Sequence, residues 1–350
     1  MFNKKILFPL VFGGIVAFLI VNGICFFYKH MPRMYDREAN ATEKSWNPGS
    51  FILQSSEGFG FYKIDKNGYI NNTTPDEVSA YILSMGASHT EGKEVSEGYR
   101  YTDLLNGYLQ KEGVDCFVYN MGHDSNFFSK IAEGFSSAIR EFPYSKAITI
   151  ELSELDISKK DYEMIIKQRP YDENQKVELL AKNASIKSKL FTLIKEWTPF
   201  INVVKTTFAN FNFDYSNVFG FKKIFSFSAK QAESGTQEID YYTMFYEVLK
   251  LMKGEYKNEI IIIFHPSLNI SSDGIVSCVY PDTYDEFEKA CQDNDVILCD
   301  VGFKYIQLYE QERLLPRGFN NTSMGTGHIN KTGHKIIADT LLPYLMEVLE

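Results

Sequence analysis

Two polar side chains in glycine-rich turns, Ser88 and His328, have the residue types that nucleophilic catalysis needs. Ser88 lies in LSMGASHTEG, five residues after the end of an apolar run at Leu83. His328 lies in GTGHINKTGHKIIAD, just before a helical pattern near the end of the chain. A serine hydroxyl is a poor nucleophile until a neighbouring base takes its proton, and histidine is the side chain that most often does so. The two residues therefore predict acyl transfer through Ser88, with His328 as the base.

Such chemistry also needs N–H groups that stabilise a developing oxyanion. The turn at Gly86 would let the backbone N–H of Ser88 point at that oxygen. Gly122, in the loop NMGHDSN, is expected to supply a second N–H, because glycine allows unusual backbone angles and close approach to a ligand. Asp124 or Ser125 in the same loop is expected to cap the next helix.

The remaining histidines are interpreted from their neighbours. His123 follows Gly122 and, together with Asn330, is a candidate substrate-lining residue. Asn330 or Thr332 can also cap the last helix. His89 follows Ser88 directly, so its side chain is expected to point away from the site. His265 is expected to cap its strand, although it can alternatively face the site, and His334 is expected to be structural or exposed. The spacing of the six histidines predicts no metal site, and we expect no cofactor.

The elements that would position these residues alternate from residue 80 onward. Strands are expected at 80–86, 115–121, 146–152, 259–264 and 296–300, and helices at 98–112, 125–141, 237–254, 283–293 and 332–348. This alternation predicts an α/β fold with a parallel sheet covered on both faces, with a mixed α+β fold as the alternative. In such sheets ligands bind beyond the carboxyl ends of the strands, where Ser88 and Gly122 would lie.

The N-terminal residues predict a membrane anchor. The stretch from Ile6 to Tyr28 carries no charge, and as a helix it is long enough to cross the ~30 Å core of a bilayer. We therefore expect an uncleaved signal anchor at 1–28, although a buried core helix is the alternative. Basic residues flank both ends, so charge alone does not orient the chain.

Three further segments complete the predicted organisation. A linker and an edge hairpin with an Asn67-Gly68 turn are expected at 29–79, followed by the main domain at 80–350. An insertion at about 157–235, rich in aromatic residues and lysines, interrupts the alternation. It is interpreted as a helical cap, or alternatively as a lid or a surface that meets the membrane or a membrane partner.

Composition narrows the function classes. The chain has 350 residues, of which 44% are hydrophobic and 23% charged, as expected for a folded globular protein. The formal net charge of −9 argues against a nucleic-acid partner. The five cysteines are scattered and predict neither a zinc site nor a disulfide framework.

The order of these motifs resembles the SGNH (GDSL-like) hydrolase superfamily over about residues 80–350, without the insertion. Gly86-Ala87-Ser88 matches the family's first block with Ala87 in place of aspartate, Gly122 matches the second block, and His328-Ile329-Asn330 with Gly333 matches the last. The resemblance implies a flavodoxin-like three-layer α/β/α sandwich with Ser88 as nucleophile, His328 as base, and an oxyanion site formed by Ser88 and Gly122.

Two positions depart from the family pattern. Leu155 stands where the family has its oxyanion asparagine, although Asp156 is present, and Gly325 stands where the acid that orients the histidine is expected. The residue that orients His328 is therefore left open among a backbone carbonyl and three acids from elsewhere in the chain: Glu151, Asp124 and Asp300.

With the membrane anchor, the chain resembles the SGNH proteins that accompany membrane-bound O-acyltransferases in bacterial polysaccharide export. This resemblance implies an extracytoplasmic esterase or O-acetyltransferase that acts on acylated sugars of surface polysaccharide, with a membrane-bound O-acyltransferase as partner. The alternative is a non-catalytic glycan-binding or scaffold subunit that keeps the same fold.

Overall fold

The computed structural model describes residues 4–36, 44–124, 127–167, 198–200, 203, 240–322 and 324–350. The chain divides into two compact units, Met1–His30 with Ile186–Ile239 and Met31–Ser185 with Asp240–Glu350. Most of the predicted insertion lies outside the described residues. Its first part contains helix α5 (Lys159–Lys167), which packs in the second unit against the helices α4 (Phe128–Glu141) and α9 (Tyr241–Glu255).

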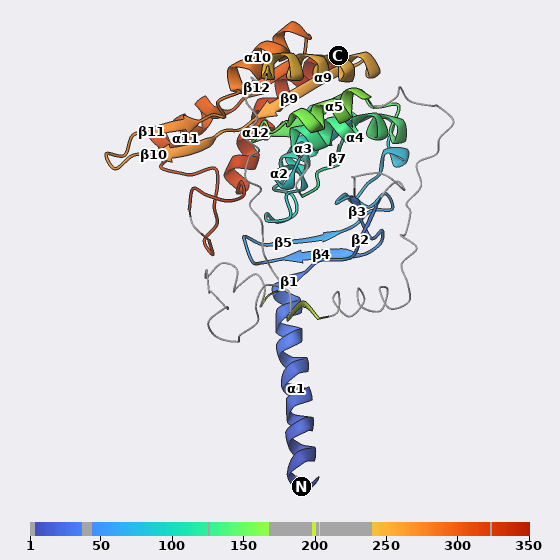
Figure 1. Ribbon diagram of the computed structural model, residues 1–350, viewed down its shortest axis with the longest axis vertical. Helices are drawn as coiled ribbons and strands as arrows, with labels where there is room; N and C mark the ends of the chain where they lie inside the picture. The colour runs from blue at the N-terminus through green and yellow to red at the C-terminus, as the bar shows by residue number, and fades with distance from the viewer. Residues whose placement is uncertain are drawn as a thin grey trace. The chain divides into compact units, whose positions relative to one another are not determined.

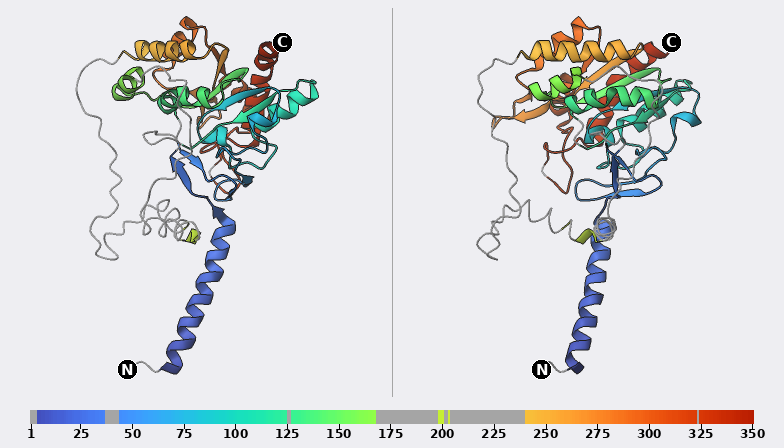
Figure 2. Two further views of the ribbon diagram at one scale, coloured as in Figure 1. Left: turned by 90° about the vertical axis from the view of Figure 1, so that its right-hand side faces the viewer. Right: turned by 45° about the vertical axis from the view of Figure 1, so that its right-hand side comes forward.

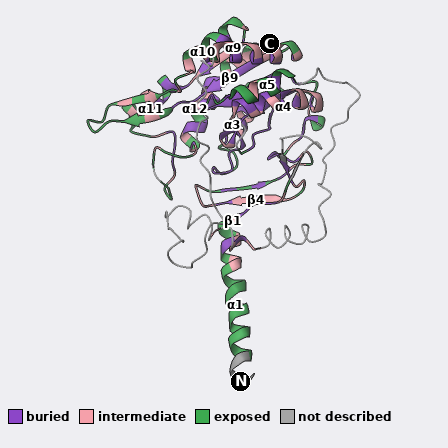
Figure 3. Cartoon of the chain, viewed as in Figure 1, coloured by how far each residue is buried: buried purple, intermediate pink, exposed green. Residues whose placement is uncertain are grey.

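The first unit contains the apolar helix α1 (Lys4–Tyr28), which is followed by the short strand β1 (Lys29–His30) (Figure 1). The segment Phe8–Tyr28 has a mean hydropathy of 2.5 and is long and apolar enough to cross a membrane. Its side chains are exposed over most of the helix (Figure 3). A soluble protein rarely exposes so large an apolar surface, so this helix is compatible with the predicted single-pass anchor.

The second unit is built on a five-stranded sheet. Its strands in chain order are β6 (Tyr81–Met85), β7 (Phe117–Asn120), β8 (Ala147–Leu152), β9 (Glu259–Phe264) and β12 (Ile297–Asp300). Every neighbouring pair is parallel, and the spatial order is β12-β9-β8-β6-β7. This is the flavodoxin-like order 2-1-3-4-5, in which the order reverses between the first and third strands. The predicted parallel α/β fold is confirmed.

Helices cover both faces of the sheet (Figures 1 and 2). Successive residues of each strand point to opposite faces, so Leu83 and Ile260 pack on one side and Ile82 and Ile261 on the other. The helices α4, α5, α9 and α10 (Tyr284–Asp293) cover the first side, and α3 (Tyr101–Lys111), α11 (Gly302–Glu312) and α12 (Lys331–Leu349) cover the second. Burial on both faces explains the unbroken apolar run EIIIIF in β9.

Shorter strands precede the sheet. They are β2 (Met34–Asp36), β3 (Lys44–Trp46), β4 (Phe51–Gln54) and β5 (Gly60–Lys63), and a 3-10 turn follows at Pro75–Glu77. The predicted hairpin exists, but its predicted turn is wrong. Strand β4 pairs with β5, so the chain reverses at residues 55–59, where Gly58 has a φ of +62°. Asn67 and Gly68 instead form a separate turn around Asp65, whose side chain and carbonyl accept their N–H groups.

Several short elements were not predicted. Helix α2 (Ser88–Glu91) follows β6, and the antiparallel strands β10 (Ser267–Ile270) and β11 (Val276–Val279) follow β9. Helix α11 was not expected either. These elements are too short, or too weakly periodic, for a residue pattern to separate them from loops.

Candidate active site

Ser88 lies at the point where the strand order of the sheet reverses. Strand β6 ends at Met85, and Ser88 is the first residue of α2. The N–H groups in the first turn of a helix have no partner within the helix, so the Ser88 N–H is suited to stabilise an oxyanion. Gly86 is required in this turn because a Cβ there would lie 2.0 Å from Thr90 Oγ1. The tight packing fixes the turn that carries Ser88.

A carboxylate that the sequence analysis did not consider orients His328. Glu57 Oε2 lies 2.7 Å from His328 Nδ1, and Glu57 Oε1 accepts the backbone N–H of His328 at 3.0 Å. Glu57 belongs to the reversal between β4 and β5. Gly327 has a φ of +75°, and a Cβ there would lie 2.5 Å from Glu57 Oε1. The glycine before His328 therefore makes room for the acid.

The three acids proposed from the sequence have other partners. Glu151 accepts from His265, Asp124 pairs with Lys93 at 2.6 Å, and Asp300 accepts from Tyr284 and from the N–H of Gly302. None of these contacts involves His328. The open choice is therefore corrected to Glu57, the carboxylate that contacts His328 Nδ1.

The ion pair shifts both of its titrating groups. Burial alone would lower the pKa of His328, but the hydrogen bond to Glu57 and the charges of Glu94 and Glu57 outweigh it and raise that pKa above its ordinary value. Burial alone would raise the pKa of Glu57, and its hydrogen bonds with His328 reverse this and lower it. The Nδ1 proton therefore stays between the ring and a carboxylate, which leaves Nε2 as the atom that can accept a proton.

His89 connects the two turns. It follows Ser88 directly in α2, and its ring centroid lies 5.4 Å from that of His328 in an edge-to-face arrangement. The His89 side chain is buried, and burial lowers its pKa to about 3, so the ring is neutral at physiological pH. The structure thus brings His328 next to the residue that follows Ser88.

Gly122 has a different contact from the one expected. Its N–H donates to Asn120 Oδ1 at 2.9 Å, so in this structure the predicted oxyanion donor is already engaged within the chain. A Cβ at Gly122 would lie 2.1 Å from the backbone nitrogen of Glu91. The glycine therefore lets the loop after β7 pack directly on α2, the helix that begins with Ser88.

This contact makes Gly122→Ala strongly destabilising. We expect the free energy of unfolding to fall by about 1–3 kcal/mol or more, because the new methyl group clashes with backbone that cannot easily move. Gly254→Ala in helix α9 is the matched control, since nothing lies within 4 Å of the position that its Cβ would take. It should be neutral or stabilise by up to about 1 kcal/mol. Denaturant unfolding of both variants measures the difference, and equal midpoints would contradict the packing argument.

The two candidate substrate-lining residues have structural contacts. His123 stacks on Trp46 with ring centroids 5.5 Å apart, and its Nε2 is buried with no hydrogen-bond partner among the described residues. Asn330 caps α12, where its side chain accepts the N–H groups of Thr332 and Gly333. Its amide also donates to the carbonyls of Leu315 and Gly318.

Asn330 also borders a cavity of about 500 Å³. Aromatic side chains of Phe59, Tyr99 and Phe319 line it together with the buried Glu94. Ser88 and His328 are not among the lining residues. Phe59 belongs to the same reversal as Glu57, so the cavity adjoins the loop that orients His328.

Leu155 is buried in the core on the α4 side of the sheet, so the position of the family asparagine presents no polar group to the site. Two oxyanion donors were predicted, the N–H groups of Ser88 and Gly122. The Gly122 N–H is engaged by Asn120, so the N–H of Ser88 is the one that the contacts above leave for an oxyanion. The same loop carries Asp156 on the surface.

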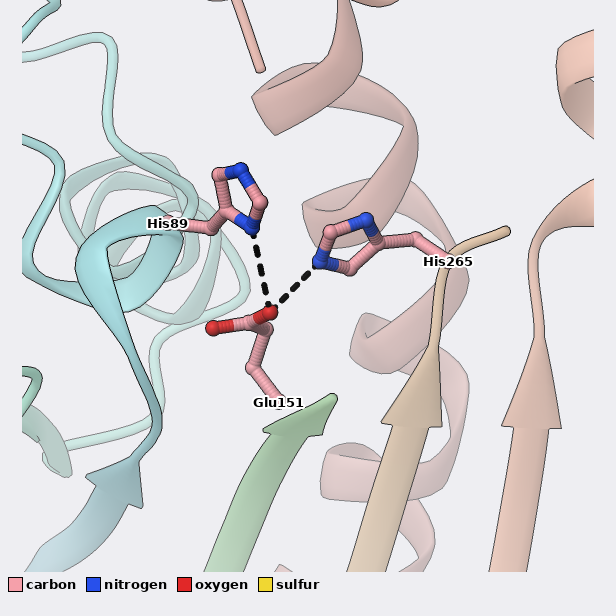
Figure 4. Close-up of side chains that lie close together, drawn as sticks. All are labelled: His89, Glu151 and His265. Carbon is pink, nitrogen blue, oxygen red and sulfur yellow. Dashed lines mark hydrogen bonds and ion pairs between the residues drawn. The ribbon is translucent and has the colours of Figure 1, made fainter. Parts of the chain in front are cut away.

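A buried cluster that includes His89, the residue after Ser88, has the residue types of a metal site. His89, Glu151 and His265 meet at one carboxylate oxygen, from α2, the end of β8 and the end of β9 (Figure 4). Arg317 Nη2 lies 2.9 Å from His265 Nδ1. A guanidinium only donates, so Nδ1 must accept and the proton of the neutral ring must lie on Nε2.

That proton faces Glu151 Oε1 at 2.5 Å, and it occupies the lone pair that a metal ion would need. Burial lowers the pKa of His265, so the ring is neutral. The contacts of these three residues therefore favour a hydrogen-bonded cluster over a metal centre.

His334, which was expected to be structural or exposed, is buried and accepts the N–H of Tyr101 at its Nδ1.

Sequence reasoning missed Glu57 and Arg317, which lie far along the chain from the residues that they contact. Glu57 is 271 residues from His328, and Arg317 is 52 residues from His265. Neither carries a local motif. The glycines in GTGH are the signal for a close approach by another segment, but they do not identify that segment.

The chain resembles known proteins in structure and not in sequence. No family model and no curated protein matches the sequence. The solved structures that it resembles include an alpha/beta hydrolase enzyme from the metagenome of Lake Arreo, with 12% identity, a TM-score of 0.40, and coverage of 78% of this chain and 97% of that one.

Two others are an acetylxylan esterase from Geobacillus stearothermophilus and a member of the lipolytic protein G-D-S-L family from Veillonella parvula. The first has 13% identity and a TM-score of 0.39, and covers 77% of this chain and 94% of that one. The second has 11% identity and a TM-score of 0.35, with coverage of 77% and 99%. At these sequence identities and TM-scores, the similarity assigns no activity to the chain.

Proposed function

We propose that this chain is an SGNH-type serine esterase or O-acetyltransferase that acts on acylated sugars of surface polysaccharide. The observation that supports it most strongly is the Glu57–His328 pair next to the turn that carries Ser88. Carboxylate, imidazole and serine hydroxyl are the three groups of a hydrolytic triad, and such triads are recognised by geometry and not by position in the sequence.

The proposed reaction has two steps. His328 Nε2 takes the proton of Ser88 Oγ as that oxygen attacks an ester carbonyl, and the N–H of Ser88 stabilises the negative oxygen of the tetrahedral intermediate. The alcohol leaves with the proton from His328, and the acyl group remains on Ser88. Water or a sugar hydroxyl then attacks the acyl-Ser88 ester, with His328 again as base. Glu57 keeps the Nδ1 proton in place and stabilises the imidazolium.

The cavity beside this loop supports a sugar as the group that carries the acyl chain. Its volume of about 500 Å³ lies in the range of small-molecule sites. Aromatic rings line it next to polar groups, a combination that suits a pyranose ring with one apolar face and several hydroxyls.

Location outside the cytoplasm and a membrane-bound O-acyltransferase partner are parts of the same proposal. The apolar helix α1 supports a membrane anchor. We expect Ile15→Arg with Leu19→Arg to release the protein from membranes, because each arginine at the centre of a span costs about 2.5–3.5 kcal/mol. Both side chains are exposed in α1, at 54% and 62%.

The measurement is the fraction of protein that stays in the membrane pellet after an alkaline carbonate wash. Phe303→Arg is the control, since this side chain is 69% exposed on α11 in the other unit. Its pellet fraction should match that of the unchanged protein. Extraction of the unchanged protein by carbonate would contradict the anchor.

A fluorophosphonate that reacts with activated serines separates the enzyme from a scaffold of the same fold. We expect covalent labelling of the full chain at Ser88, with loss of labelling when His328 is replaced by alanine. An unlabelled folded protein would favour the non-catalytic alternative. Because the probe needs no knowledge of the acyl group or the glycan, the result does not depend on finding the natural substrate.

A further inference from the structure

We propose that Glu151, His265 and Arg317 form a buried relay of hydrogen bonds that positions the Ser88 turn and the His328 loop relative to each other. The relay runs from the residue before the serine to the residue before the histidine. It deepens the proposed function and rests on it, because it assigns positioning residues to that site. None of the three residues is expected to touch the substrate.

The first end of the relay holds the serine turn. Glu151 Oε2 accepts the backbone N–H of Ala87 at 3.2 Å and the hydroxyl of Thr90 at 2.9 Å. Ala87 precedes Ser88, and Thr90 lies in the same short helix α2. Glu151 is the penultimate residue of β8, so a rigid central strand anchors these bonds.

The other end holds the histidine loop. Arg317 Nη1 donates to the carbonyl of Gly327 at 3.1 Å, and Gly327 precedes His328. The backbone continues this link, because Arg317 forms a bridge with Ile329 and the N–H of Gly318 donates to the carbonyl of His328 at 3.0 Å. Segment 316–318 thus runs alongside the His328 loop.

His265 joins the two ends. Its Nε2 lies 2.5 Å from Glu151 Oε1, and its Nδ1 lies 2.9 Å from Arg317 Nη2. Arg317 Nη2 also donates to the carbonyl of His265 at 3.2 Å. The imidazole donates at one nitrogen and accepts at the other, which no carboxylate or guanidinium can do.

Charge and burial strengthen the hydrogen bonds of the relay. Burial alone would raise the pKa of Glu151, but the hydrogen bond from His265 and the closeness of His89 hold it well below its usual value, so the carboxylate is charged. Burial lowers the pKa of Arg317, yet a guanidinium stays protonated in proteins. All three side chains are at least nine-tenths buried. Both Nη atoms of Arg317 have partners, although its Nε has none among the described residues, and losing one member of the network would leave the others without partners.

The test uses the full chain in detergent and follows hydrolysis of an aryl acetate. Two variants break the relay: His265→Gln cannot accept at the Nδ1 position, and Arg317→Met keeps the length of the side chain without its donors. Arg317→Lys retains the charge and part of the donor capacity. His334→Gln is the matched control, because it removes a buried histidine acceptor from the N–H of Tyr101 outside the relay.

We expect His265→Gln and Arg317→Met to lower kcat about 10- to 100-fold, the size of effect that misplacement by about 1 Å produces, with little change in KM. Arg317→Lys should restore part of the loss, and folded His334→Gln should keep its kcat within about threefold. Thermal unfolding identifies variants that do not fold. If Arg317→Met does not fold, the kcat values of His265→Gln and Arg317→Lys test the relay in its place. Unchanged kcat in the relay variants, or an equal loss in His334→Gln, would overturn the relay.

A second readout does not depend on activity. The charged and titratable groups that face His328 include Glu57, Glu94, Lys93, His89 and Asp124. If the relay holds the His328 loop against Glu57, Arg317→Met should lower the pKa of His328 toward its ordinary value near 6.5, as followed by NMR of ring-labelled histidine. An unchanged titration would contradict the relay. Absence of esterase activity in the unchanged protein, or its persistence in Ser88→Ala, would instead contradict the proposed function.

Discussion

Replacing Ser88 with alanine should abolish hydrolysis of an aryl acetate, with a loss in kcat of at least about 10,000-fold. Without the hydroxyl no acyl-enzyme can form, and what remains comes from the oxyanion site and binding alone. The fold should be unaffected, because Ser88 is the first residue of a short helix and its side chain is only partly buried. The rate is measured by release of the phenolate, and the fold by thermal unfolding.

Ser153→Ala is the control for this substitution. Ser153 directly follows β8 and is also partly buried at the carboxyl edge of the sheet, so it matches Ser88 in residue type and setting. Its kcat should stay within about threefold of that of the unchanged protein. If Ser88→Ala keeps its activity, acyl transfer through this serine is wrong.

Replacing Glu57 with glutamine should have the second-largest effect, a fall in kcat of about 100- to 10,000-fold. The amide is nearly isosteric, but it can present an N–H group to His328 Nδ1 and so favours the wrong tautomer. In the unchanged protein the Nδ1 proton lies against the Glu57 carboxylate, 2.7 Å away. Glu154→Gln, an exposed glutamate just after β8, is the control and should leave kcat unchanged.

The pH dependence of kcat/KM should also change in Glu57→Gln, in a direction that follows from the pKa of His328. Catalysis needs the neutral form of His328, and Glu57 raises the pKa of that residue, so activity in the unchanged protein is lost at a higher pH than an ordinary histidine would give. Removing the negative charge lowers that pKa, so the acid limb of kcat/KM should move to lower pH while the plateau falls. An acid limb that stays in place would show that Glu57 does not control the base.

The part of the fold that the sequence predicts is the part with regular periodicity. The five sheet strands are apolar and separated by helical segments, so both their existence and their parallel orientation are recoverable from pattern, whereas their order is not. The β4–β5 hairpin was expected with the wrong turn, because Asn67-Gly68 is the stronger local signal although the chain reverses at residues 55–59. Turn chemistry says where a chain can bend, and pairing between strands decides where a hairpin forms.

The site divides in the same way. Ser88 lies two residues after Gly86, and His328 directly follows Gly327, so their types and local motifs suggest a role. Glu57, His265 and Arg317 act through contacts made only after the strands are assembled, and nothing near them in the sequence indicates a partner. Gly122 shows the opposite case, in which a local motif is present but the expected role is not. The N–H of Gly122, which was expected to stabilise an oxyanion, donates a hydrogen bond to Asn120 instead.

The position of Glu57 ties the activity of the domain to its N-terminal margin. The acid comes from the hairpin before the sheet, whereas the serine and the histidine come from the sheet domain itself. A cut anywhere between residues 64 and 80 would leave every strand of the sheet and both of those residues in one fragment, and would separate them from the acid. A shortened chain that begins at the first sheet strand would therefore keep Ser88 and His328 but lack Glu57, and we expect it to lose the activity proposed for the whole chain.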